Sequence, residues 1–214
     1  ISAVVPQDGV AIHAGLMSRA IRFAVETNEP SIVVRRWSPN TGSVSAVEVP
    51  VSRPVSIVTS SWNVWVHPAV INRILEIREK ELPNETGGIL VGVVDRDQQT
   101  IAVSDLVVAP SDSQAWPTSF IRGSNGLAAK VARLGMRSLG NIVYVGEWHS
   151  HPVACDASPS ALDLAAVALC SPETRADGLP TLMMIASSTE LGIVFTPIED
   201  DTPDIVKIPY PSSP

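Results

Sequence analysis

The stretch EWHSHP, residues 147–152, carries more chemical information than any other part of this sequence. Alternate side chains of a strand point to the same side, so a strand ending here places His149 and His151 together. Pro152 stops the strand and favours an extended conformation for the residue before it. Two imidazole rings are therefore expected to converge at one strand end, as a candidate pair of metal ligands.

A helix is expected shortly afterwards, over residues 158–169. Ser158 suits the N-cap position, and Pro159 suits the first helical position. Asp163 would then project from the first turn and a half, within reach of the histidines. Two neutral imidazoles and one carboxylate form a three-ligand zinc site with a fourth position open, which is the pattern of catalytic rather than structural zinc.

The histidine pair has other possible interpretations. A histidine at a strand end is more often an ordinary core or surface residue, and other metal-binding folds also use a His-x-His pair. Those folds need more histidines, whereas this chain has four, and His13 and His67 lie far from the pair in sequence. The histidine count excludes most rival metal sites.

These residues resemble the JAMM zinc metalloproteases, also called MPN+ or JAB, many of which are deubiquitinases. The family pattern of an upstream glutamate, His-x-His-Pro, seven residues and Ser-x-x-Asp is met by Glu85, residues 149–152 and residues 160–163. The stretch ETGGILVG, residues 85–92, resembles the glutamate-bearing strand, whose glycines would permit close backbone approach. The resemblance covers about residues 60–200. It implies an α/β protein with the MPN fold, a mixed curved β-sheet flanked by helices.

The resemblance also implies a role for each residue of the motif. Zinc held by His149, His151 and Asp163 would lower the pKa of its bound water towards about 7. Glu85 would take the proton from that water and later pass it to the leaving amine. Ser160 would donate its hydroxyl to the oxyanion of the tetrahedral intermediate.

Two further residues near the motif, Glu147 and Cys155, could also take part in the site. Glu147 shares the strand parity of the histidines, but it lies a further ~7 Å from His149 by strand rise, which suits an acid at the edge of the site better than the base. Cys155, in the loop between the strand and the helix, could touch the site or be oxidised. A loop cysteine without a role is the favoured interpretation.

In this family the bond cleaved is commonly the amide or isopeptide bond after the last glycine of a ubiquitin-like protein, so the resemblance implies such a partner. An extended tail binds well by adding to a sheet edge. Residues 110–126, with Trp116 and Phe120, and residues 171–180 are expected to be loops at the positions where such enzymes insert substrate-binding elements. The two aromatic residues could equally be core anchors of a long loop.

Residues 1–58 are expected to form an appendage, with an amphipathic helix over residues 10–26 and a hairpin of strands 31–37 and 43–51. They resemble the closing part of an E1-like (ThiF-type) adenylation domain. That resemblance implies the protease end of an E1-JAB fusion, which would account for the start at Ile1, in a bacterial ubiquitin-like pathway such as one used in antiviral defence. The implied partners are an E1- or E2-like protein, or the E1 domain of the same protein.

Hydrophobic periodicity predicts the remaining elements. Further helices are expected over residues 69–81 and 127–138. Strands are expected over residues 61–66, 86–94, 100–109, 141–151, 181–187, 191–197 and 205–208. The metalloprotease domain would span residues 59–208, followed by a disordered tail over 209–214.

Composition excludes several classes of protein. The 214 residues, 45% hydrophobic and 17% charged, suit one globular domain plus a fragment. A net charge of -7 has the wrong sign for binding nucleic acid. Two cysteines give no disulfide framework, and no apolar run approaches the roughly 18 residues of a membrane span. A cytoplasmic protein with neither nucleic acid nor membrane as partner is expected.

The resemblance to the JAMM family implies a zinc-dependent isopeptidase or peptidase that acts on a ubiquitin-like protein, either processing precursors or deconjugating targets. Two alternatives stay open. One is a non-catalytic MPN interaction module, although such proteins typically lack one or more ligands. The other is a metallopeptidase that removes a small adduct from a sulfur-carrier protein.

Overall fold

The computed structural model describes residues 27, 29–37, 40–153 and 155–210. The chain divides into two compact units, Ile1–Arg53 and Pro54–Pro214. The helix expected over residues 10–26 lies outside the described residues. In the first unit, β1 (Ser31–Trp37) pairs antiparallel with β2 (Val44–Pro50), and this confirms the expected hairpin.

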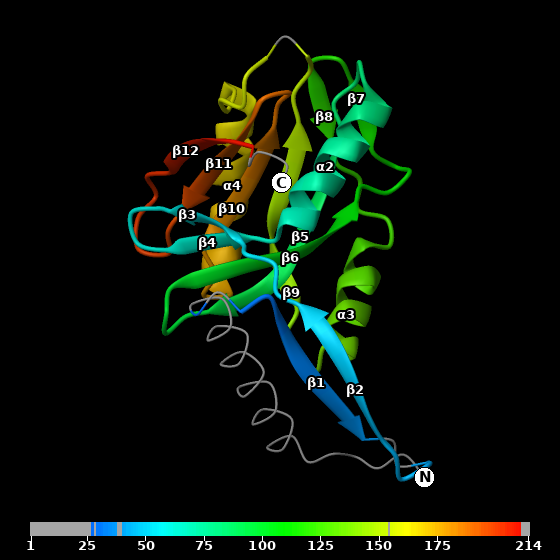
Figure 1. The fold of residues 1–214 in the computed structure, drawn as a ribbon. Coiled ribbons are helices and arrows are strands. Elements are labelled where there is room, and N and C mark those ends of the chain that lie inside the picture. Colours follow the sequence, from blue (N-terminus) through cyan, green and yellow to red (C-terminus); the bar gives the residue numbers. More distant parts are fainter. Residues whose placement is uncertain (1–26, 28, 38–39, 154, 211–214) are drawn as a thin grey trace. The chain divides into compact units, whose positions relative to one another are not determined.

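The second unit is built on one mixed sheet of eight strands, drawn in Figure 1. Its strands lie in the order β12-β11-β10-β9-β5-β6-β4-β3. The pairs β9/β10 and β4/β6 are parallel, and the other neighbours are antiparallel. The bounds are β3 (Val55–Val58), β4 (Asn63–Val66), β5 (Gly87–Asp95), β6 (Thr100–Val108), β9 (Val143–Ser150), β10 (Thr181–Ala186), β11 (Glu190–Thr196) and β12 (Asp204–Pro209).

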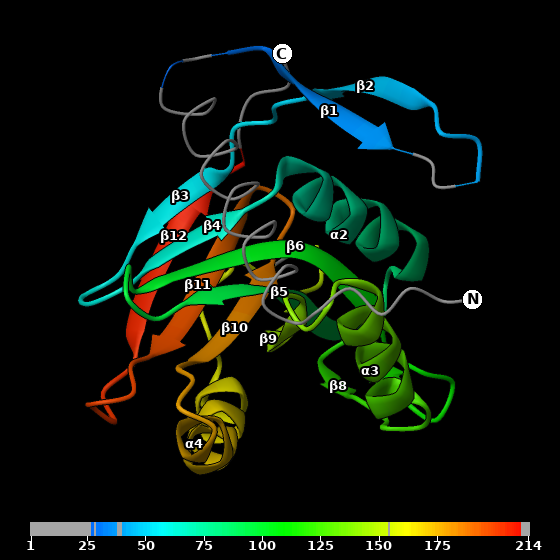
Figure 2. The ribbon, with the colours of Figure 1, turned by 90° about the horizontal axis from the view of Figure 1, so that it is seen from below.

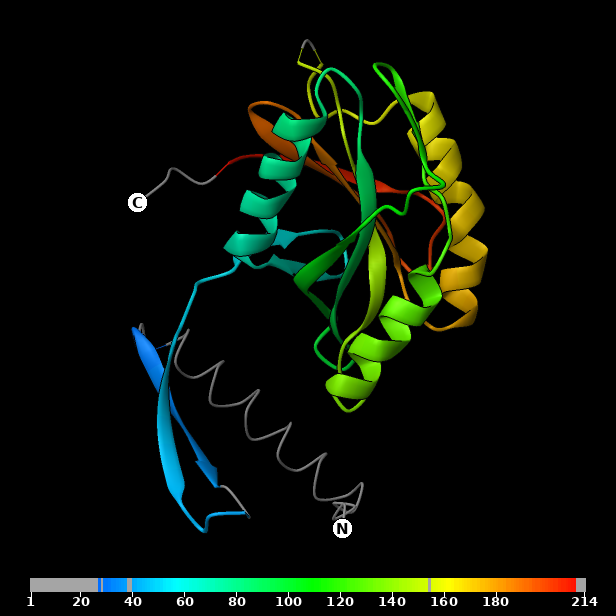
Figure 3. The same ribbon diagram turned by 90° about the vertical axis from the view of Figure 1, so that its right-hand side faces the viewer.

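Helices cover both faces of this sheet. Figure 3 shows α2 (Pro68–Glu81) on one face, and α3 (Leu127–Arg137) and α4 (Ala161–Ala176) on the other. The start of α2 follows from its sequence: Pro68 occupies the first turn, and the His67 ring accepts a hydrogen bond from the Ala69 amide. This arrangement confirms the expected fold class, a mixed curved sheet flanked by helices.

Each face of the sheet has its own apolar core. The larger core lies under α2, which contributes Val70, Ile71 and Ile74. The smaller core lies under α4, where Val167 packs with residues of β10 and β11. The strands between the helices are buried on both faces, and all six residues of β10 are buried.

The sheet curls until its two ends meet, as Figure 2 shows for β3 and β12. The Ser60 amide, just after β3, donates to Asp204 Oδ2 at the start of β12 over 2.7 Å. Nearby, the rings of Trp62 and Phe195 lie 6.4 Å apart between centroids. Curling lets both ends of the sheet contribute to the core under α2.

The structure corrects two expected loops. Helix α4 continues to Ala176, so residues 171–176 of the expected loop 171–180 are helical. The helix tolerates Pro172 on its exposed side, while Ser171 is buried and donates to the Val167 carbonyl. The expected loop 110–126 contains a small hairpin, β7 (Gln114–Trp116) with β8 (Ser119–Ile121).

Two expected boundaries also differ. β3 was not expected as a strand, and it belongs to the large sheet although it lies within residues 1–58. At the other end, β12 extends to Pro209, and the Tyr210 hydroxyl donates to the Ser187 carbonyl over 3.0 Å. The structure therefore describes residues 209 and 210 of the expected tail, and residues 211–214 lie outside the described residues. Within the described residues, no helix is long and apolar enough to cross a membrane.

Candidate metal centre

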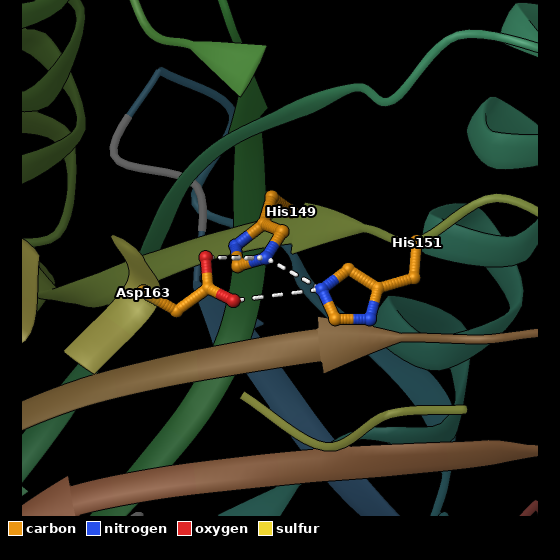
Figure 4. Close-up of side chains that lie close together, drawn as sticks. All are labelled: His149, His151 and Asp163. Atoms are coloured by element: carbon orange, nitrogen blue, oxygen red, sulfur yellow. Dashed lines mark hydrogen bonds and ion pairs between the residues drawn. The ribbon is translucent and has the colours of Figure 1, made fainter. Parts of the chain in front are cut away.

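Three predicted ligands meet at the end of β9 (Figure 4). His149 Nε2 lies 3.3 Å from His151 Nε2. Asp163, from the first turn of α4, places Oδ1 3.2 Å from His149 Nε2 and Oδ2 3.6 Å from His151 Nε2. All three side chains are largely buried. The structure thus brings together residues that are up to 14 positions apart in the sequence.

These separations fit a zinc ion. Zn–N and Zn–O distances of about 2.0–2.1 Å in a tetrahedron place neighbouring ligand atoms about 3.3–3.4 Å apart. The separations of His149 Nε2 from His151 Nε2 and from Asp163 Oδ1, 3.3 and 3.2 Å, are close to that value, and the second carboxylate oxygen lies 3.6 Å from His151 Nε2. The donor set of two imidazole nitrogens and a carboxylate oxygen is also one that zinc accepts. The residues present therefore fit a catalytic-type zinc site.

The tautomer of His151 is set by a backbone carbonyl. His151 Nδ1 lies 2.7 Å from the Asp156 carbonyl oxygen, which can only accept a hydrogen bond. Nδ1 must therefore carry a proton, and a neutral ring then presents the Nε2 lone pair to the site. Burial works against the charge of His151, but hydrogen bonds to Asp163 and to the Asp156 carbonyl outweigh burial and raise its pKa.

The Asp163 carboxylate is oriented by the start of its own helix. Ser160, rather than the expected Ser158, is the N-cap of α4, because its hydroxyl accepts a hydrogen bond from the Asp163 amide and the helix begins at Ala161. The Ser160 amide in turn donates to Asp163 Oδ2 over 2.7 Å, completing a capping box. Burial opposes the charge of Asp163, yet hydrogen bonds from His149, His151 and Ser160 outweigh burial and lower its pKa.

Glu85 lies two residues before the start of β5 and interacts electrostatically with the three ligands. Its side chain is buried, and burial raises its pKa. The charges of His149 and His151 lower this pKa, and the charge of Asp163 raises it further, with a net increase. The Glu85 amide donates to the Trp116 carbonyl of β7 over 2.9 Å, so the small hairpin is attached at this residue.

The glycine after Thr86 is required by close packing, as expected. A Cβ atom on Gly87 would lie 2.5 Å from the Trp148 carbonyl oxygen and 2.6 Å from the Phe120 ring. Phe120 is half-buried against this glycine, whereas Trp116 is 43% exposed. The structure thus separates the two aromatics of the hairpin: Phe120 anchors it and Trp116 is free to contact a ligand.

The competing acid and the nearby cysteine lie apart from the ligand cluster. Glu147 Oε1 accepts a hydrogen bond from Arg122 Nη2 over 2.6 Å, in a half-buried ion pair. Cys155 is exposed and is not a member of the cluster. Sequence analysis missed Arg122 and the Asp156 carbonyl, since neither belongs to the motif.

Comparison with known proteins places the chain. Residues 67–194 match the Prok-JAB family, the prokaryotic homologs of the JAB domain. The chain belongs to this family. The match spans both histidines, Glu85 and Asp163, and it begins after residues 1–58, so their resemblance to an adenylation domain stays a prediction.

The chain is similar to a curated protein and to a protein of known structure. A CD-NTase/cGAS isopeptidase of Enterobacter hormaechei subsp. hoffmannii (strain UCI 50) is 44% identical over 69 residues, which is 32% of this chain and 37% of that protein. The solution structure of protein DSY2949 from Desulfitobacterium hafniense is 21% identical, covers 67% of this chain and 88% of its own, and has a TM-score of 0.41.

Proposed function

We propose that this JAB-family protein is a zinc-dependent isopeptidase or peptidase that cleaves after the C-terminal glycine of a ubiquitin-like protein. The observation that carries the proposal is the convergence of His149, His151 and Asp163 beside the buried acid Glu85. Its two cysteines are free, which fits a reducing compartment, so we place the reaction in the cytoplasm.

His149 Nε2, His151 Nε2 and the Asp163 carboxylate would hold the zinc ion. Bound zinc supplies Lewis acidity, which makes water nucleophilic near neutral pH and polarises the carbonyl under attack. The protein's part is to present a donor atom of each ligand to the ion. For His151, the Asp156 carbonyl selects the neutral tautomer whose proton lies on Nδ1, which leaves the Nε2 lone pair for zinc.

Glu85 would move the proton. A general base works best when its pKa is close to the pH of the reaction, and burial raises the pKa of Glu85 in that direction. Its carboxylate takes a proton from the attacking water and delivers it to the nitrogen of the leaving amine. A general acid-base residue typically contributes about 10²- to 10⁴-fold to the rate.

Ser160 would stabilise the oxyanion. Its hydroxyl oxygen already accepts a hydrogen bond from the Asp163 amide, which fixes the oxygen in place. A hydroxyl that accepts one bond can still donate its own proton. That proton is available for the negative charge that develops on the carbonyl oxygen of the substrate.

The substrate tail would lie along the β7–β8 hairpin. This hairpin is joined to Glu85 through the Trp116 carbonyl, and it is a two-stranded sheet of its own among the described residues. An extended peptide can add to such an edge by backbone hydrogen bonds, with Trp116 exposed beside it. The isopeptidase name of the Enterobacter relative favours an isopeptide bond over a small adduct on a sulfur carrier.

The proposal is tested with purified protein and a fusion of a ubiquitin-like protein whose tail ends in glycine. We expect about one zinc per chain, cleavage after the glycine, and loss of cleavage on chelation that returns when zinc is added. Asp163→Asn should lose both zinc and cleavage. Stoichiometric zinc without cleavage of any such tail would instead favour a non-catalytic interaction module, and cleavage that survives complete removal of metal would contradict the mechanism.

A further inference from the structure

Arginine takes the place of an apolar residue on the buried face of α2. Val70, Ile74 and Arg78 follow one another at intervals of four residues, and all three are buried. Arg78 is 1% exposed. The periodicity of the helix therefore places a permanent positive charge where a hydrophobic side chain would normally complete the core.

Ion pairing does not account for this burial. The carboxylate partner of Arg78 is its neighbour Glu79, which accepts from Nη1 over 2.8 Å but is 66% exposed. Nη2 has no hydrogen-bond partner among the protein atoms of the described residues. Burying a charge without a buried partner is costly, so the position of Arg78 needs another explanation.

The remaining donor of Arg78 contacts a metal ligand. Nε donates to the main-chain carbonyl oxygen of His151 over 3.1 Å, a buried hydrogen bond between residues 73 positions apart. Hydrogen bonds from a charged donor are stronger than neutral ones, and more so in a buried site. Arg78 thus holds the backbone of a candidate zinc ligand from the opposite face of the sheet.

His151 needs such an anchor more than His149 does. His149 lies inside β9, where Gly87 of β5 and Ile185 of β10 are its neighbours in the ladder. His151 follows the end of β9, where the ladder stops. Its amide donates to the Ala186 carbonyl over 2.8 Å, which leaves its own carbonyl to Arg78.

We propose that Arg78 is a positioning residue for the metal centre, because its Nε–H fixes the peptide plane of His151 and so aims the ring at the zinc. The proposal rests on the zinc site of the proposed function. Partners that orient metal ligands typically change metal affinity by about 10- to 100-fold when they are removed.

Three substitutions separate the hydrogen bond from charge and bulk. Gln places an amide nitrogen as many bonds from Cα as the Nε of Arg78, so Arg78→Gln keeps a donor there without the charge. Met places a methyl group at the same point, so Arg78→Met keeps the bulk without a donor. Lys places a methylene there and its ammonium one bond further, so Arg78→Lys keeps the charge. The matched control is Arg73→Met. Arg73 is an exposed arginine of the same helix, and it pairs with Asp105.

The measurements are zinc affinity of the metal-free protein by chelator competition, the visible spectrum of its Co²⁺ complex, and urea unfolding without metal. Arg78→Met should bind zinc about tenfold or more weakly and alter the Co²⁺ spectrum, whereas Arg78→Gln and Arg73→Met should stay within about threefold of the parent. Should Arg78→Met fail to fold, tighter zinc binding by Arg78→Gln than by Arg78→Lys supports the proposal, and the reverse order overturns it.

Three other results would also overturn the proposal. Arg78→Met could bind zinc as tightly as the parent, or Arg78→Gln could lose as much affinity as Arg78→Met. A parent protein that binds no zinc would overturn this proposal together with the proposed function, so the two failures are distinguishable.

Discussion

Two carboxylates near the histidine pair, Glu85 and Glu147, differ in their surroundings. Glu147 is paired with Arg122 over 2.6 Å, so its carboxylate is already engaged by a guanidinium. Glu85 is buried beside the three ligands, and its pKa is raised. The environment rather than the residue type therefore decides which acid suits proton transfer.

Substituting each acid by its amide tests this assignment. Glu85→Gln should retain about one zinc per chain but lose about 10²- to 10⁴-fold in kcat, because the ligands stay and the proton acceptor is gone. Glu147→Gln, the control, should retain zinc and lie within a few fold of the parent in kcat. Turnover numbers measured beside metal content decide the matter, and full activity of Glu85→Gln would contradict the mechanism.

The close packing around Gly87 can be tested by adding a single methyl group. Gly87→Ala should lower the free energy of unfolding by about 1–3 kcal/mol, because its Cβ would overlap the Trp148 carbonyl and the Phe120 ring. Gly135→Ala is the control, since a Cβ there meets only the Ile142 carbonyl at 3.5 Å and lies in a helix, where alanine is favoured by up to about 1 kcal/mol. Urea unfolding of both variants gives the comparison, and equal stabilities would refute it.

Residues of the site were predictable from the sequence when they belong to a motif with a fixed spacing. His149, His151 and Asp163 could be inferred from residue type and spacing, and Glu85 from the resemblance to the JAMM family. The Asp156 carbonyl belongs to the backbone and leaves no signal in side-chain identity. Arg78 and Arg122 act through contacts across 73 and 25 positions, and such pairings emerge only from the folded sheet.

At the scale of elements, the first turn of α4 serves two purposes. The Ser160 side chain caps the helix, and Asp163, the acid that completes the capping box, also faces both histidines. Forming the helix therefore orients the carboxylate before any metal binds. The capping box is a common pattern at helix starts. Here it contributes to the candidate metal centre because the two histidines at the end of β9 lie beside it.

Replacing Ser160 separates capping from chemistry. Ser160→Ala should lower the free energy of unfolding by about 1 kcal/mol, whereas Ser160→Gly should cost only a few tenths, since glycine is a tolerated N-cap. Both lack the hydroxyl, so both should lose about 100- to 1,000-fold in kcat if it stabilises the oxyanion. Activity that follows stability across the two variants would instead assign Ser160 to capping alone.

Regular elements were predictable from periodicity, and irregular ones were not. The spans of α2 and α3 follow their apolar residues closely. The end of α4 was missed because Pro172 suggests a stop, although its ring lies on the exposed side of the helix. The hairpin of β7 and β8 was missed because three-residue strands have too few positions to show alternation.

For the molecule as a whole, curvature of the sheet is what local sequence could not predict. Every strand of the large sheet except β3 is visible in its own sequence pattern, but the hydrogen bond between Ser60 and Asp204 joins residues 144 positions apart. That closure explains why β3 belongs to the large sheet rather than to the preceding segment. Ile57 of β3 is 2% exposed and is part of the core under α2.

The domain boundary gives the final prediction. Removing residues 1–53 should change the free energy of unfolding of the remaining chain by less than about 1 kcal/mol, because the buried core residues of both apolar clusters lie after Pro54. Removing residues 1–58 also deletes β3, which exposes the edge of β4 and removes the buried Ile57, a loss of about 2–5 kcal/mol. Urea unfolding and zinc binding of the two truncated proteins test this, and equal stability of the two would place the boundary after β3 instead.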